Sequence, residues 1–167
     1  MENNKSIEDV LAVILEEHSV SCARLLEIIR QERQHIIHGR VDELEHVIEE
    51  KAGLQEDIAE LETRRLSLVK EFARKYRIDT TEPHLEDIIA VVDESYGTHY
   101  KLLQKRLRKV FKQIELMHEG NRILIARSIS FQERSFMLLF GVTKDRVRYE
   151  KDGQVTHSNK PLIDSTM

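Results

Sequence analysis

Residues 85–131 decide the fold, and they read LEDIIAVVDESYGTHYKLLQKRLRKVFKQIELMHEGNRILIARSISF. Apolar residues recur here at alternating steps of three and four, with a few polar residues on the same stripe. The stripe runs through Leu85, Ile89, Val92, Tyr96, His99, Leu103, Leu107, Val110, Ile114, Met117, Asn121, Leu124, Ser128 and Phe131. A seam that keeps this spacing for over six heptads is typical of a long helix with coiled-coil packing. We therefore expect one helix over about residues 83–140, with Thr81 as its N-cap and Pro83 in its first turn.

Two further helices are expected upstream, over about residues 6–38 and 41–77. Ser6 to Asp9 resembles a capping box, and Gly39 suits the left-handed position after a helix. The first seam runs through Leu11, Leu15, His18, Cys22, Leu25, Ile29, Glu32 and Ile36, and the second through Leu44, Val47, Lys51, Leu54, Ile58, Leu61, Arg65, Leu68 and Phe72. Because Lys51 and Arg65 fall inside an apolar stripe, they must reach its edge or a buried acid.

These patterns predict an all-α fold, an elongated antiparallel bundle of three long helices with coiled-coil character over residues 1–141. Residues 142–167 are expected to form a mobile C-terminal tail. Within it, residues 146–149 and 154–156 flank the turn signal Asp152-Gly153, so a small hairpin is the alternative to mobility.

The composition excludes several classes of protein. Six glycines, two prolines and 5 % aromatic residues do not suit a β-sandwich, a barrel or an enzyme with a deep cofactor pocket, so we expect no enzyme and no cofactor. A net charge of −4 argues against nucleic-acid binding by the whole chain. The start of the chain is polar, and no apolar run approaches the roughly 18 residues of a membrane span, so a soluble cytoplasmic protein without membrane insertion is expected. A single cysteine, Cys22, agrees with a reducing compartment and is expected to be a small buried hydrophobe.

Charge is segregated between the second and third helices. Residues 42–62 hold nine acids and one base, whereas residues 101–112 hold six bases and no acid. Folding the chain about a turn near Thr80 places residue i opposite roughly residue 160 − i, so the acidic block is expected to face the basic block. The alternative for the basic block is a patch that binds nucleic acid or acidic lipid.

The same folding places Asn121 opposite the turn at Gly39 and leaves residues 122–140 without an opposing helix. This overhang is rich in isoleucine, leucine and phenylalanine, and an exposed apolar stretch of that size marks a partner site. Two alternatives are a bend at Gly120, with a fourth helix folding back, and a homodimer formed through the overhang. Gly97 is a second point at which the helix could bend. Asn121 is either buried, where it would fix the register, or exposed at the bend.

Three Glu-x-x-His pairs suggest an enzyme alternative, a carboxylate di-iron site in a four-helix bundle. The pairs are Glu32/His35, Glu43/His46 and Glu115/His118. Their positions argue against it, because Glu43 and His46 straddle the stripe and Glu32 and His35 lie next to a helix end. We therefore expect no metal.

The chain resembles the FlgN family of flagellar export chaperones over roughly residues 7–155. The resemblance rests on Glu43-Leu44, Lys51, Leu54, Leu61-Glu62 and Arg64-Arg65 in the acidic helix, on Asn121-x-x-Leu124, and on Tyr149-Glu150-Lys151-Asp152-Gly153 in the tail. The last dozen residues depart from that pattern.

The resemblance implies a cytoplasmic type III secretion chaperone. Such a protein holds hook-associated proteins of the hook–filament junction, prevents premature assembly and delivers them to the export apparatus. In this family the C-terminal region carries client binding, which agrees with the overhang. We therefore expect client contacts at Leu124, Phe131, Phe136, Leu139 and Phe140, with Asn121 as a register or hinge residue and Tyr149 as a further contact. The alternatives are a coiled-coil adaptor of another secretion or cytoskeletal complex, a chaperone for another flagellar client such as the filament cap, and the di-iron protein.

Overall fold

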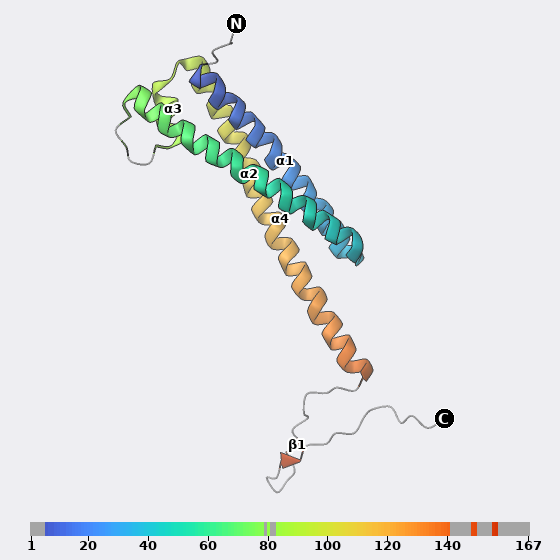
Figure 1. Ribbon diagram of the computed structural model, residues 1–167. Coiled ribbons are helices and arrows are strands. Elements are labelled where there is room, and N and C mark those ends of the chain that lie inside the picture. The colour runs from blue at the N-terminus through green and yellow to red at the C-terminus, as the bar shows by residue number, and fades with distance from the viewer. Residues whose placement is uncertain (1–5, 79, 81–82, 141–147, 150–154, 157–167) are drawn as a thin grey trace. The chain divides into compact units, whose positions relative to one another are not determined.

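A computed structural model describes residues 6–78, 80, 83–140, 148–149 and 155–156. In chain order the elements are α1 (Ile7–His38), α2 (Val41–Tyr76), α3 (Leu85–Val91), α4 (Glu94–Phe140), β1 (Arg148–Tyr149) and β2 (Val155–Thr156) (Figure 1). The chain divides into two compact units, Met1–Asn121 and Arg122–Met167, and the boundary falls within α4. The helical bundle is confirmed, with four helices among the described residues instead of the three expected. The domain boundary expected at residue 141 stays a prediction.

Local sequence signals set the ends of the first two helices. The Ser6 hydroxyl accepts a hydrogen bond from the Asp9 N–H at 3.1 Å, and the Asp9 carboxylate accepts one from the Ser6 N–H at 3.3 Å, which completes the capping box. Gly39 ends α1 with a φ of 64°, a conformation that glycine adopts without a Cβ penalty. α2 then runs from Val41 to Tyr76, unbroken by Gly53. Both expected ranges are confirmed to within one residue.

The expectation of a single third helix is wrong. The chain forms α3 and then α4, because Val92 has extended backbone angles (φ −86°, ψ 164°). Val91 and Val92 are β-branched, which lowers their preference for the helix. Next to them, the Asp93 carbonyl accepts a hydrogen bond from the Gly97 N–H at 2.9 Å, which opens a new helix.

The N-cap expected at Thr81 is also wrong. Thr81 lies outside the described residues, and α3 begins at Leu85 with His84 as its N-cap. The His84 N–H donates to the Asp87 carboxylate at 2.8 Å, so the acid of the first turn fixes this end. Pro83 therefore precedes the helix instead of occupying its first turn.

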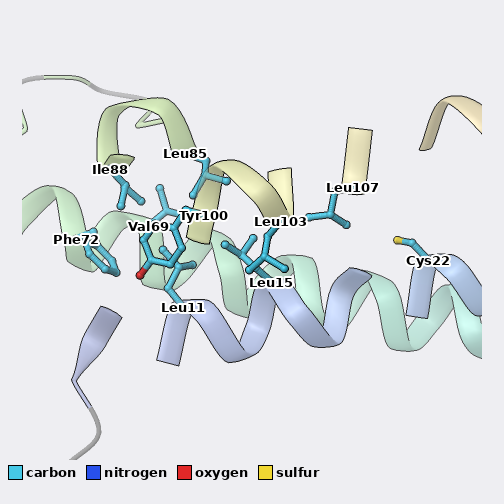
Figure 2. Packing of buried hydrophobic residues seen from close by; sticks show 10 residues of the cluster. All are labelled: Leu11, Leu15, Cys22, Val69, Phe72, Leu85, Ile88, Tyr100, Leu103 and Leu107. Carbon is cyan, nitrogen blue, oxygen red and sulfur yellow. The ribbon is translucent and has the colours of Figure 1, made fainter. Parts of the chain in front are cut away.

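The core of the first unit draws on α1, α2, α3 and the part of α4 up to Asn121. Figure 2 shows ten of its buried side chains: Leu11, Leu15, Cys22, Val69, Phe72, Leu85, Ile88, Tyr100, Leu103 and Leu107. A second cluster lies farther along α1 and nearer the start of α2, and it comprises Leu25, Ile28, Ile29, Val47 and Leu54. All positions of the expected α1 seam from Leu11 to Glu32 are buried, so this seam is confirmed.

The two basic residues of the α2 seam find acids, as expected. Lys51 Nζ lies 2.5 Å from Oε1 of the buried Glu32 in α1. Arg65 binds Glu62 through two hydrogen bonds of 2.7 Å each, one from Nε and one from Nη2. Each cation thus leaves the apolar stripe for a carboxylate at its edge or within it.

The expected register between α2 and α4 is wrong by about three helical turns. Glu32 binds both Lys51 and Asn121, so Lys51 lies level with residue 121, whereas the folding rule placed it level with residue 109. Glu8 likewise binds Lys75 and Tyr100. The reason is that the chain does not reverse in a tight turn near Thr80. It reverses through α3, which adds its own buried layer to the core.

This shift separates the two charged blocks. Arg108 of the basic block pairs with Glu86 at the start of α3, and in the α-helical part that the structure describes no ion pair joins residues 42–62 to residues 101–112. The expected neutralisation of the basic block by the acidic block is therefore wrong. Asn121 also lies opposite Glu32, two turns away from Gly39, instead of opposite the turn.

A short hairpin is present in the second unit. β1 and β2 pair antiparallel, with Arg148 opposite Thr156 and Tyr149 opposite Val155. Of the two alternatives for the tail, the hairpin is the one found at these four residues. The rest of the tail expected over 142–167 lies outside the described residues.

Candidate functional site

The helical part of the second unit carries many exposed apolar side chains. α4 is unbroken from Glu94 to Phe140, so neither Gly97 nor Gly120 ends it. The large exposed apolar residues between 123 and 140 are Ile123, Ile125, Ile129, Phe131, Phe136, Met137, Leu138, Leu139 and Phe140. In the described residues no helix is both long and apolar enough to cross a membrane. A set of this size instead marks an interaction surface.

Four of these residues form one line, which we call the aromatic stripe: Ile125, Ile129, Phe136 and Phe140. Their steps of four, seven and four return to the same face at about 100° per residue. The rings of Phe136 and Phe140 contact each other, with centroids 4.4 Å apart and planes tilted by 35°. Leu139 lies beside this line, so three of the expected contacts share one face.

The other two expected contacts lie elsewhere on the helix. Leu124 and Phe131 are seven residues apart and therefore share a face with each other, more than 100° around the helix from Phe136. Leu124 is half-buried, whereas Phe131 is 73 % exposed. The sequence reading extended the heptad seam unchanged beyond Asn121 and so passed over Ile125 and Ile129. Tyr149, the remaining expected contact, lies in β1.

Asn121 is buried. Of the two alternatives for this residue, burial is the one in which it would fix the register of α4. Its side-chain amide donates to the Ile29 carbonyl at 3.0 Å and to Glu32 Oε2 at 3.1 Å, and the residue is 2 % exposed. Because Glu32 also binds Lys51, one carboxylate of α1 holds side chains from both α2 and α4. Sliding α4 by one turn would leave the Asn121 amide buried without these partners, which is what a residue that sets the register requires.

A groove in the first unit forms a second candidate site. It has a volume of about 1070 Å³ and lies between α2, the start of α3 and α4. Leu66 of α2 and Phe111 of α4 line it, and both are substantially exposed. The sequence reading missed it, although the signal was present. Leu66 directly follows the seam position Arg65, and Phe111 directly follows the seam position Val110. Each therefore widens the apolar stripe of its helix on one side.

His18 of α1 lines this groove and is 4 % exposed. Its ring meets Phe111 edge-on, with centroids 5.8 Å apart. Burial lowers the pKa of His18, the positive charge of Arg65 lowers it further, and Glu62, 3.9 Å away, opposes both. His18 is therefore neutral near pH 7. Neither ring nitrogen has a hydrogen-bond partner among the described residues, although a neutral imidazole offers one donor and one acceptor.

The structure does not bring the three Glu-x-x-His pairs together. Glu32 is committed to Lys51 and Asn121, whereas Glu43, His46, Glu115 and His118 are exposed. Over the described ranges, no group of three or more metal-ligating side chains is found.

Cys22 is fully buried, as expected. Burial raises the pKa of its thiol to about 11, and the negative charge of Glu62 contributes to this rise. A thiol with such a pKa is protonated and unreactive near neutral pH.

Comparison with known proteins identifies a family. No curated protein and no solved structure matches the chain. The family model described as FlgN protein matches residues 1–157, which is nearly the whole chain. The protein therefore belongs to the FlgN family.

Proposed function

We propose that this protein is a cytoplasmic flagellar export chaperone that binds hook-associated proteins of the hook–filament junction. The family supports a role as a flagellar export chaperone in general. The single observation that supports client binding by this chain is the aromatic stripe, an exposed apolar face on the part of α4 beyond Asn121.

The aromatic stripe suits a client segment that is disordered in isolation and helical when bound. Apolar side chains of such a segment pack against Phe136 and Phe140. The client cannot polymerise while its own segment is held on this surface. Leu139 extends the same surface, and Leu124, Phe131 and Tyr149 remain proposed contacts outside the stripe. Asn121 acts from the core, as the residue that holds the register of α4. Delivery to the export apparatus then releases the client.

Charge placed on the stripe tests this proposal. The double variant Phe136→Asp/Phe140→Asp puts two carboxylates where apolar client side chains must dock, and the expected result is loss of at least about tenfold in affinity for a hook-associated protein. The matched control is Val20→Asp/Leu116→Asp, which charges two equally exposed apolar positions in the first unit.

The measurement is co-purification of a hook-associated protein with each tagged chain, followed by titration calorimetry, with far-UV circular dichroism as the check on helicity. Unchanged co-purification by the Phe136/Phe140 variant at unchanged helicity would refute the site. Light scattering on the same samples tests the homodimer alternative, which requires twice the monomer mass and its loss in this variant.

A further inference from the structure

The groove beside His18 has an unmet polar requirement. Its walls are largely apolar, yet a buried neutral imidazole lines it with both nitrogens lacking a partner among the described residues. A buried polar group without a hydrogen bond lowers the stability of the folded state. An occupant that covered the apolar walls and also supplied a hydrogen bond to His18 would recover this cost.

The rim of the groove is basic on the side of α4. Lys101, Lys105, Arg108 and Lys112 follow each other at steps of four, three and four, so they share one face, and Arg108 itself lines the groove. All four are exposed, and among the residues that the structure describes only Arg108 of these four has an ion pair.

Few acids offset this charge. Of the described residues that line the groove, the acids are Glu86, which Arg108 binds, and Glu62, which Arg65 binds; Glu115 lies at the far end of the basic face. Lys70 lines the groove from α2. In the register that the helices adopt, no ion pair of the described residues joins the acidic block of α2 to this basic face.

We propose that this groove binds an amphipathic helix of a partner protein, whose apolar residues fill the groove and whose flanking residues are aspartate or glutamate. The basic face covers twelve residues, from Lys101 to Lys112, and its eleven steps of 1.5 Å span about 16 Å, so it fits about three turns of helix. A polar side chain in the middle of the apolar face reaches His18. The inference concerns the first unit and does not depend on client binding by the aromatic stripe.

Two features favour a helix over a membrane surface. The site is concave, with a volume near the upper end of the roughly 300–1,000 Å³ typical of ligand pockets, and helix-in-groove docking uses such a shape. His18, whose ring nitrogens lack a partner among the described residues, also lines the groove, where a flat layer of headgroups does not reach.

The test uses the full-length chain and two synthetic 18-residue peptides. Both carry leucines at i, i+3, i+4 and i+7 with one central glutamine, and they differ only in flanking residues, glutamate in one and lysine in the other. Fluorescence anisotropy is expected to show at least tenfold tighter binding of the glutamate peptide, with the difference shrinking at high salt. The ring ¹⁵N signals of His18 are expected to shift on binding.

Variants locate the site. Leu66→Asp is expected to weaken binding at least tenfold, whereas Ile37→Asp, which charges an exposed apolar position outside the groove, leaves it unchanged. If Leu66→Asp does not fold, the surface variant Lys101→Glu/Lys112→Glu takes its place and is expected to reverse the preference between the peptides.

Three results would overturn the proposal. One is equal binding of the two peptides. Another is binding that disappears in Phe136→Asp/Phe140→Asp but persists in Leu66→Asp, which would move the site to the aromatic stripe. The third is binding to vesicles with 30 % anionic lipid while neither peptide binds. Failure of client binding by the stripe, in contrast, leaves all of these peptide results unchanged.

Discussion

Glu8 gives the sharpest prediction about stability. Its buried carboxylate lies near the start of α1 and binds two residues at the end of α2. Its Oε1 accepts from Lys75 Nζ at 2.6 Å and from the Tyr76 hydroxyl at 2.5 Å, and its backbone carbonyl accepts from the Tyr100 hydroxyl at 2.8 Å. Burial raises the pKa of Glu8, but the hydrogen bonds and the charge of Lys75 outweigh it and lower the pKa to about 2.

The shift sets the size and the sign of the effect. The ordinary pKa is 4.5, so the difference of about 2.5 units corresponds to about 3 kcal/mol at about 1.4 kcal/mol per unit. Because the pKa in the folded state is depressed, this stability is present in full above pH 4.5 and is lost as the pH falls toward 2. Glu8→Gln removes the charge at every pH. The variant is therefore expected to be less stable than the parent by up to about 3 kcal/mol at pH 7, with the gap closing below pH 4.5.

Urea unfolding followed by circular dichroism at pH 7, 4 and 2.5 measures this gap. Subtracting the variant from the parent cancels the other titrating groups, and Glu17→Gln, an exposed position on the same helix, controls for the loss of one negative charge. A gap that stays constant from pH 7 to pH 2.5 would show that the Glu8 carboxylate does not contribute through its ionised form.

Three further substitutions have defined outcomes by the same unfolding assay. Lys51→Met leaves the buried Glu32 carboxylate without its cation and should cost about 3 kcal/mol, and a loss under 1 kcal/mol would contradict the buried pair. Gly53→Ala should stabilise the chain by up to about 1 kcal/mol, because an added Cβ meets nothing within 4 Å, and a loss would show that the site is crowded. Gly39→Ala should destabilise it by about 1 kcal/mol, because of the positive φ, and a gain would exclude that conformation.

The sequence predicts the positions that face the core and the ends of α1 and α2, but not the break that separates α3 from α4. The heptad steps of α1 identify even the polar seam residues His18 and Glu32, since periodicity reports which face is buried. Leu85, Ile89 and Val92 keep the same steps, so the pattern continues through the break at Val92, where the backbone becomes extended. Periodicity is silent about that backbone change.

The register and the site depended on tertiary contacts. Asn121 could be placed on the seam from its spacing, but its partner Glu32 follows only from the path of the chain through α3. The sequence shows that residues 122–140 are rich in apolar residues. The line through Ile125 and Phe136 does not continue the heptad seam of residues 85–121, so extending that seam does not identify it. The sequence predicts the basic block of α4. It also predicts that the acidic block of α2 faces it, which is wrong because the chain reverses through α3 and not in a tight turn near Thr80.

The buried thiol of Cys22 is a built-in probe of how readily the bundle opens. A lone thiol with 0 % exposure and a pKa of about 11 is closed to alkylating reagents while α1, α2 and α4 stay together. Modification of Cys22 therefore requires an opening of the bundle. Mass spectrometry of the wild-type chain measures the rate at which Cys22 is labelled. That rate reports how readily the bundle opens and whether a bound partner makes opening rarer.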